Sequence, residues 1–209
     1  MTITTIGIDL AKNVFQIHGV DGSGKTVLKK QLRRNQVLTY FIKLTTCTIG
    51  IEACGGAHYW ARKLRAMGHT VKLMAPQFVK PYVKANKTDA ADAEAICEAV
   101  TRPNMRFVAI KNVEQQAILS LHRARQGFVK ARTAQANQIR GLLGEYGITI
   151  PQGIKYVMKD MLKLLDPPEH DLPGAFTDLL KRLHTHLLVL EEQVSDLETQ
   201  INSWHSNKE

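Results

Sequence analysis

The sequence predicts an α/β domain in which helices flank a mixed sheet, followed by long helices that form a coiled coil. Residues 3–9 and 47–52 are two short runs of β-branched and apolar residues, and each run ends in an acid. Segments with helical spacing separate these runs from further strand-like runs, which is the pattern of an α/β fold. From Leu180 to Trp204, apolar residues recur in alternating steps of three and four, the period of a coiled coil.

The first three predicted strands form an antiparallel meander. Residues 3–9 are predicted as a central strand, with Asp9 at or near its C-terminal end. Residues 13–20 alternate apolar and polar side chains, as a half-buried strand does. The turn signal Asp21-Gly-Ser-Gly follows, and residues 25–34 alternate again. Lysines in this third strand favour a place at the edge of the sheet.

Helices and strands alternate in the next part of the chain. Residues 37–44 have helical spacing, and the strand 47–52 ends at Glu52. A helix is predicted over residues 59–67, ended by Gly68. The strand that follows, residues 70–75, is stopped by Pro76, and a last short strand is expected at residues 107–110.

Four acids on three of these elements could meet at one site. Asp9 and Glu52 each end a strand that looks buried, and sites in open α/β sheets form at such carboxyl ends. Asp89 and Asp92 share one face of a helix that begins near Thr88. Taken singly, the acids also suit bland roles as turn residues, a helix cap and first-turn acids. Taken together, four clustered carboxylates would repel one another without a metal, so they predict a two-metal phosphodiester site that holds Mg²⁺ or Mn²⁺.

The composition favours a nucleic-acid partner. The 209 residues carry a net charge of +9, with a pI near 9.5, and such a field attracts polyanions. The sequence has no long apolar run for a membrane span and no signal peptide pattern, so no membrane partner is expected. Three cysteines without C-x-x-C spacing indicate reduced thiols, which is typical of a cytoplasmic protein.

Three stretches of the sequence carry a family resemblance: Gly7-Ile-Asp-Leu-Ala-Lys12, Ile51-Glu-Ala-Cys-Gly-Gly56 and Ala75 to Asp92, which contains Pro-Gln-Phe-Val-Lys-Pro and Lys-Thr-Asp-Ala-Ala-Asp. They resemble the DEDD transposases of bacterial insertion sequences, and more closely the insertion-sequence family numbered one hundred and ten. The resemblance covers roughly residues 3–150. It implies a RuvC-like domain with the RNase H fold. The four acids of the family pattern fall on Asp9, Glu52, Asp89 and Asp92, the same residues that the strand and helix pattern selects.

The resemblance also implies a function. Such proteins are similar in being site-specific DNA recombinases guided by a bridge RNA, with a second domain that carries a catalytic serine, often used across protomers. No serine of this kind is found here, because Ser195, Ser203 and Ser206 lie on or beyond the coiled-coil segment. We therefore expect a truncated or partial protein. Two other functions stay open: an RNA- or DNA-binding and dimerisation module without catalysis, and a stand-alone junction nuclease.

Basic residues suggest where nucleic acid binds. Four lysines near the acids are expected to hold phosphates: Lys12, Lys80, Lys84 and Lys87. A long helix is predicted over residues 113–146, and its basic residues outnumber its acids. Its candidates for phosphate contact are Arg123, Arg125, Lys130, Arg132 and Arg140. The alternative is that these residues form an ordinary solvated face.

Four segments summarise the predicted organisation. They are a RuvC-like domain at 1–110, a basic helix with a short helical connection at 111–165, a linker at 166–174 and a coiled-coil helix at 175–209. The apolar stripe of the last helix could pack on a second copy, giving a homodimer or higher oligomer. It could equally pack on the helix 113–146 of the same chain. His184 and His186 are expected to be solvated.

Overall fold

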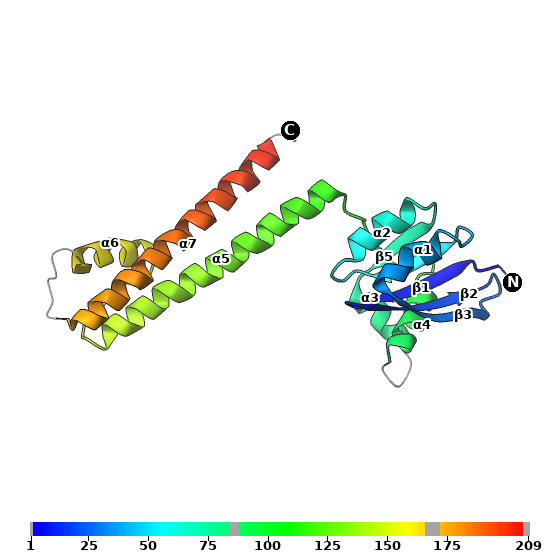
Figure 1. The fold of residues 1–209 in the computed structure, drawn as a ribbon, viewed down its shortest axis with the longest axis horizontal. Helices are drawn as coiled ribbons and strands as arrows, with labels where there is room; N and C mark the ends of the chain where they lie inside the picture. The colour runs from blue at the N-terminus through cyan, green and yellow to red at the C-terminus, as the bar shows by residue number, and fades with distance from the viewer. Residues whose placement is uncertain (1, 84–87, 166–171, 207–209) are drawn as a thin grey trace. The chain divides into compact units, whose positions relative to one another are not determined.

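The computed structural model describes residues 2–83, 88–165 and 172–206 (Figure 1). The chain forms two compact units, residues 1–112 and residues 113–209. Each unit has a hydrophobic core of its own. Unit 1 contains the sheet, and unit 2 contains only helices.

Unit 1 is built on a six-stranded mixed sheet in the order β3-β2-β1-β4-β5-β6. The strands are β1 (Thr5–Leu10), β2 (Val14–Val20), β3 (Thr26–Arg33), β4 (Thr48–Glu52), β5 (Thr70–Met74) and β6 (Phe107–Val108). The first three form an antiparallel meander, β1, β4 and β5 run parallel, and β6 is antiparallel to β5. The carboxyl ends of β1, β4 and β5 therefore lie along one edge of the sheet.

Helices cover both faces of this sheet. On one face, α4 (Asp89–Ala99) packs on β1, β2 and β4. On the other, α2 (Ala57–Arg65) packs on β4 and β5 and contacts the short helix α1 (Val37–Phe41). Isoleucines of β1 and β4 are almost fully buried in the core between the sheet and α2. Burying apolar side chains in this way is the main stabilisation of such a layered domain.

The fold class predicted from the sequence is confirmed. A mixed sheet flanked by helices precedes long helices, in an arrangement consistent with a RuvC-like domain. The stop at Pro76 was predicted, but the short helix α3 (Pro76–Val79) and the 3-10 turn η2 (Lys80–Tyr82) after it were not. Another 3-10 turn, η1 (Arg34–Gln36), links β3 to α1. The described part of the chain contains no helix that combines the length and hydropathy needed to cross a bilayer.

Unit 2 consists of a long antiparallel hairpin and a shorter helix. Its helices are α5 (Val113–Gly144), α6 (Ile154–Leu165) and α7 (Gly174–Ser206). The two long helices, α5 and α7, lie side by side, and α6 packs against both near the closed end of the hairpin (Figure 1). Gly147 adopts a positive φ of 73°, and the amides of residues 147 and 148 close the end of α5 onto its last carbonyls.

The apolar stripe of α7 packs on α5 of the same chain. Every stripe position is buried or half-buried, and Leu180 and Leu187 share a core with Ile139 and Leu143 of α5. The intramolecular hairpin, one of the two arrangements that the sequence left open, is therefore the one that the structure contains. Because the stripe is covered within the chain, the heptad pattern gives no support to a homodimer through this face.

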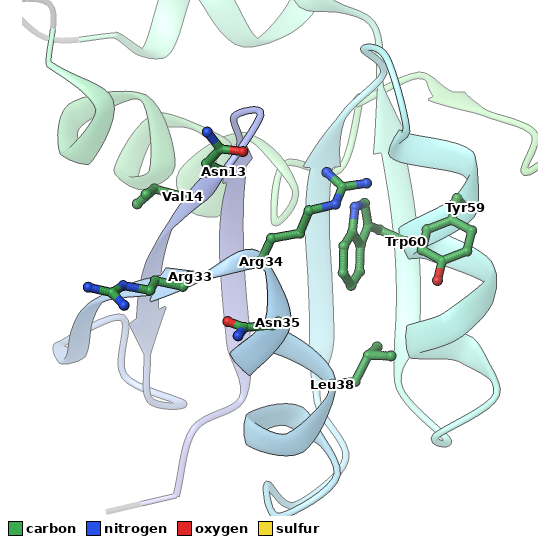
Figure 2. A pocket seen from close by; sticks show the side chains of 8 residues that line it. All are labelled: Asn13, Val14, Arg33, Arg34, Asn35, Leu38, Tyr59 and Trp60. Carbon is green, nitrogen blue, oxygen red and sulfur yellow. The ribbon is translucent and has the colours of Figure 1, made fainter.

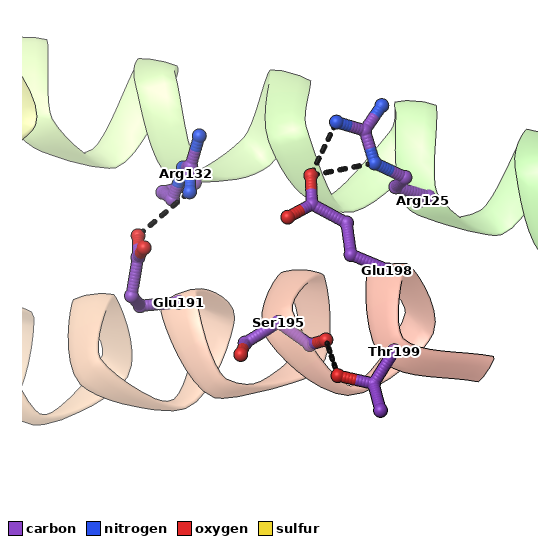
Figure 3. Close-up of polar contacts among 6 residues, drawn as sticks. All are labelled: Arg125, Arg132, Glu191, Ser195, Glu198 and Thr199. Atoms are coloured by element: carbon purple, nitrogen blue, oxygen red, sulfur yellow. Dashed lines mark hydrogen bonds and ion pairs between the residues drawn. The ribbon is translucent and has the colours of Figure 1, made fainter. Parts of the chain in front are cut away.

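Two ion pairs fix the register of the hairpin (Figure 3). Arg125 donates from Nε and Nη2 to one carboxylate oxygen of Glu198, with an Nε–Oε1 distance of 2.8 Å. Arg132 Nη1 lies 2.7 Å from Glu191 Oε2. The partners advance by seven residues in α5 and retreat by seven in α7, which is the antiparallel heptad register.

One histidine prediction was wrong. His184 is buried, with only 6% of its surface exposed, and burial lowers its pKa because the charged form loses solvation. Its Nε2 has no hydrogen-bond partner among the described residues. His186 is exposed, and its Nδ1 lies 2.7 Å from Gln135 Oε1. Position 184 sits on the buried side of α7, where it joins the apolar stripe.

The ion pairs should make unequal contributions to the stability of the hairpin. A double-mutant cycle on Arg132 and Glu191 is expected to give a coupling energy of about 1 kcal/mol, and one on Arg125 and Glu198 about 0.5 kcal/mol. The first is larger because Arg132 is only 18% exposed, against 38% for Arg125, so water screens it less. Urea unfolding of the full chain, followed by helical circular dichroism, measures both cycles. Equal couplings near zero would contradict this register.

Candidate metal centre

Two neighbouring parallel strands carry the same triplet of glycine, isoleucine and acid near their carboxyl ends. The triplet is Gly7-Ile-Asp9 in β1 and Gly50-Ile-Glu52 in β4, and the strand register pairs Gly7 with Gly50. Side chains alternate along a strand, so each acid points to the same face of the sheet as the glycine two residues before it. The register therefore brings Asp9 and Glu52 next to each other at the carboxyl edge of the sheet.

The two glycines allow α4 to cross very close to this face. A Cβ atom on Gly7 would lie 2.3 Å from the carbonyl oxygen of Ala93 and 2.4 Å from the amide nitrogen of Cys97. A Cβ on Gly50 would lie 2.8 Å from Cβ of Val100. Only glycine permits such an approach of helix backbone to strand. The close crossing brings the first turn of α4 within reach of the acids on the strands.

The start of α4 supplies the other two acids. Thr88 caps the helix, because its hydroxyl oxygen accepts a hydrogen bond from the amide of Ala91 at 3.2 Å. Asp89 and Asp92 then occupy the first turn, one turn apart on the same side. The capping interpretation is therefore correct for Thr88, and it leaves the carboxylates of the first turn available for another role.

Three of the four acids converge closely. Asp9, Asp89 and Asp92 each offer a carboxylate oxygen, and these oxygens all lie within 4.8 Å of one another. Glu52 does not belong to this triplet, but it lines the same cavity of about 610 Å³ as Asp9 and Asp92. Helix α3 and turn η2 form the opposite wall of that cavity with Gln77, Val79 and Lys80 among others.

The electrostatics of the site are unfavourable without a cation. The pKa of Asp9 is raised from 3.8 to about 6, first because burial removes solvation from its charged form. Repulsion from the carboxylates of Asp92, Asp89 and Glu52 raises this pKa further. A carboxylate with such a raised pKa in a cleft indicates a functional site, since a fold has no structural reason to gather these charges.

The residues present fit a hard divalent cation. Mg²⁺ takes oxygen ligands at about 2.0–2.1 Å, so two oxygens on one such ion lie at most about 4.2 Å apart. The oxygens of the triplet lie within 4.8 Å of one another, so a contraction of about half an ångström would bring them all onto one Mg²⁺. All the ligand candidates are oxygen donors, which favours Mg²⁺ or Mn²⁺ over softer metals such as zinc.

The four predicted lysines fall in different places. Lys80 is exposed and lines the cavity of the acids. Lys12 is exposed just beyond the end of β1, and its backbone carbonyl accepts a hydrogen bond from Arg34. Lys84 and Lys87 lie outside the described residues.

Three of the five basic residues predicted to bind phosphate on α5 have partners inside the chain. Arg125 and Arg132 form the ion pairs with α7, and Nε of Arg140 donates to the carbonyl of Ile150. Their donors hold the helical unit together, which makes them weak candidates for nucleic-acid contact. The other two, Arg123 and Lys130, are exposed, and neither forms an ion pair with a described residue.

Sequence reasoning missed two parts of the site. The first is the role of Gly7 and Gly50, although the repeated glycine–isoleucine–acid pattern carried a signal for it. The second is the cavity wall formed by α3 and η2, which the run Pro-Gln-Phe-Val-Lys-Pro encodes. Four helical residues are too few to produce a detectable helical period.

The chain is similar to known transposases over nearly its whole length. The model of the DEDD transposase family named for IS110, described as "Transposase", matches residues 6–148. A "Probable family 20 transposase" of Pseudomonas aeruginosa is 50% identical over 97% of this chain and 60% of its own length. The "Transposase for insertion sequence element IS1328" of Yersinia enterocolitica is 44% identical over 96% of this chain and 59% of its own length.

A third relative extends this similarity to another bacterium. The "Transposase for insertion sequence element IS1111A" of Coxiella burnetii is 41% identical over 96% of this chain and 55% of its own length. The chain thus spans between about half and three fifths of the length of these curated relatives. The family model covers the whole sheet except Thr5 at the start of β1, and it covers the helices from α1 to α5. The chain therefore belongs to the IS110-type family of DEDD transposases.

Proposed function

We propose that this chain is the metal-binding part of a DNA transposase that acts as a site-specific recombinase. The observation that carries the proposal is the convergence of Asp9, Asp89 and Asp92 beside Glu52 at the carboxyl edge of the sheet. The names of the relatives, transposases of insertion sequences, support the same function. Mg²⁺ is the metal we propose, with Mn²⁺ as an alternative, because all candidate ligands are carboxylates.

Each residue of the site would have a distinct role. Asp9 lies among the other carboxylates and would be the shared ligand of the site, while Asp89 and Asp92 close it from the helix. When bound, a divalent cation supplies Lewis acidity toward the phosphate of a DNA strand. Lys80, at the opposite wall of the cavity, would bind the same phosphate backbone. Glu52 would complete the ring of carboxylates from the neighbouring strand.

DNA and a guide RNA are the partners we propose. The net charge of +9 supports binding of either polyanion, and Arg123 and Lys130 offer exposed cations on α5. The guide RNA is an expectation of the family resemblance. A homo-oligomer also stays a proposal, and it would need a surface other than the stripe of α7, such as the exposed Leu188 and Val189. Such a protein would act in the bacterial cytoplasm, where its DNA lies.

Manganese binding tests the proposed function directly. Titration of the full chain with Mn²⁺, followed by the electron paramagnetic resonance of the free ion, is expected to show saturable binding. Asp92→Asn should weaken this binding at least tenfold, because it removes one carboxylate from the triplet. Asp196→Asn is the matched control, since Asp196 is an exposed acid on α7 in unit 2. Equal affinities for the two variants would refute the site.

DNA assays separate the functions that the sequence left open. Binding of duplex and branched DNA should weaken steeply between low and high salt, as expected when several phosphates are contacted. Metal-dependent nicks in branched DNA would point to a stand-alone nuclease. Metal and DNA binding without strand scission would point to a binding and assembly role for this chain.

A further inference from the structure

A second cavity opens at the same edge of the sheet, on the face opposite the carboxylates. It has a volume of about 630 Å³, within the range of sites that hold small molecules. Its lining comes from the start of β2, the end of β3 with η1, and the helices α1 and α2 (Figure 2). The lining residues are Asn13, Val14, Arg33, Arg34, Asn35, Leu38, Tyr59 and Trp60.

The strand register places this cavity beside the metal centre. Asp9 pairs with Gln16 two residues inside β2, and Val14 at the start of β2 pairs with Arg33 at the end of β3. Asp9 and Arg33 therefore lie at the same edge of the sheet. The metal centre and the second cavity lie on opposite faces of the sheet. Asp9 points toward α4 on one face, and on the other face Phe15 of β2 contacts Trp60 of α2, with 4.9 Å between the ring centres.

The floor of the cavity is an aromatic and cationic stack. Trp60 is 4% exposed, and the guanidinium of Arg34 lies 5.2 Å from the centre of its ring (Figure 2). Arg34 is held there because its Nη1 donates to the carbonyl of Lys12 at 3.3 Å. The guanidinium of Arg34 therefore places a positive charge beside the indole of Trp60 at the cavity.

The rim offers a partly exposed aromatic ring, with the Lys63 ammonium 5.8 Å from its centre, and positive charge with no acid of the described residues beside it. Tyr59 is 40% exposed and packs edge-on against Trp60, with 5.2 Å between ring centres. No acid lines the cavity, and neither Arg33 nor Arg34 forms an ion pair with a residue in the described ranges. The amides of Asn13 and Asn35 add donors and acceptors at the rim. An aromatic face, a cation and amides are the groups that bind a base and its phosphate.

We propose that this cavity holds one unpaired nucleotide of a strand whose backbone continues to the metal centre. The base stacks on Tyr59 and on the plane of Arg34, and a neighbouring phosphate lies against the guanidinium of Arg33. An acidic peptide would use the cations but not the aromatic rim, which is why a nucleotide is the better fit. The proposal rests on the proposed function, because it takes the strand at the metal centre to be nucleic acid.

Stacking on Tyr59 gives the sharpest test. Binding of a fluorescent ten-nucleotide DNA strand to the full chain is measured by anisotropy. Tyr59→Leu is expected to weaken binding about tenfold, since base stacking on one aromatic side chain contributes roughly 1–3 kcal/mol. Tyr59→Phe keeps the ring and should bind as the unchanged chain does. Tyr156→Leu is the matched control, because Tyr156 is 38% exposed on α6 in the other unit.

Two further arms identify the ligand and isolate this site from the metal centre. A strand of abasic nucleotides should bind equally to Tyr59→Leu and to the unchanged chain, because it has no base to stack. An RNA strand with the sequence of the ten-nucleotide DNA shows whether the bound nucleotide comes from DNA, RNA or either. Mn²⁺ binding should be unaffected by Tyr59→Leu, so loss of metal binding in Asp92→Asn and loss of stacking are separate readouts. Equal DNA affinity for Tyr59→Leu and Tyr156→Leu would overturn the proposal.

Discussion

Replacement of Gly7 by alanine is expected to destabilise unit 1 by about 3 kcal/mol and to abolish divalent metal binding. The added Cβ would lie 2.3 Å from the carbonyl oxygen of Ala93 and 2.4 Å from the amide of Cys97. Both contacts are to backbone atoms of α4, so no side-chain rotation relieves them and the helix must move. Overpacking of this kind typically costs 1–3 kcal/mol, and a helix backbone places the cost at the upper end. The moved helix carries Asp89 and Asp92 away from Asp9.

Graded controls make this result specific. In Gly50→Ala the added Cβ would lie 2.8 Å from Cβ of Val100 and 3.1 Å from both of its methyl groups, which is less close than the backbone contacts at Gly7, so a smaller loss is expected. Val100→Ala should restore part of that loss. Gly22→Ala is the neutral control, since its Cβ would meet only a methyl group of Thr4 at an ordinary 3.8 Å. Thermal unfolding and Mn²⁺ titration measure each variant, and a Gly7→Ala chain as stable as Gly22→Ala would refute the close helix crossing.

The contacts of Gly7 are the part of the site that the sequence patterns did not predict. The strands, their terminal acids and the spacing of Asp89 and Asp92 could be predicted, because strand and helix periods are local signals. These local periods did not by themselves decide between a helix cap and a metal ligand. The joint pattern of four acids and the family resemblance favoured the ligand, but the distance of α4 from the sheet could not be predicted. That distance is set by contacts between Gly7 and residues 86 and 90 positions further along the chain. No local pattern records such a pairing.

The helical unit shows a second limit. The apolar period of α7 predicts a stripe but does not name the surface that covers it, so hairpin and dimer were equally compatible with the sequence. Glu191 and Glu198 are seven residues apart, as are Arg125 and Arg132. The acids face the arginines only when the two helices are aligned antiparallel. Arg125 and Arg132, two of the arginines that were predicted to bind phosphate, form ion pairs with these acids. A basic helix beside an acidic one is as consistent with a hairpin as with a nucleic-acid surface.

Asp9→Asn is expected to change the stability of the chain in opposite directions without and with metal. In the metal-free chain the substitution removes a buried charge and its repulsion from Asp92, Asp89 and Glu52. Since Asp9 is half-buried and partly screened, we expect a gain of about 1–2 kcal/mol at pH 7, less than its full pKa shift would give. With metal at 100 times its dissociation constant, the unchanged chain gains about 2.7 kcal/mol. The asparagine variant, lacking a ligand, should gain much less, so the order of stability reverses.

The pH dependence of the stability difference between Asp9→Asn and the unchanged chain is a second, independent test of this prediction. The pKa of Asp9 in the folded chain is about 6, above the ordinary value of 3.8, so the folded state holds its proton more tightly. Below pH 3.8 the carboxyl is protonated in both states and costs nothing, and the penalty grows as pH rises through 6. The advantage of Asp9→Asn in the metal-free chain should therefore be small at pH 4 and complete by pH 7.

Chemical denaturation at these two pH values, with and without Mn²⁺, measures the four combinations, and Asp196→Asn is the control that should show neither effect. Asp9→Asn less stable than the unchanged chain in the absence of metal would mean that the carboxylate has a structural partner. If Asp9→Asn is more stable than the unchanged chain without metal and less stable with metal, the carboxylate of Asp9 contributes to cation binding and not to the stability of the metal-free fold. If these carboxylates form the proposed metal site, the same balance would explain why β1, β4 and α4 all place carboxylates at one edge of the sheet, because a bound divalent ion would remove the repulsion among them.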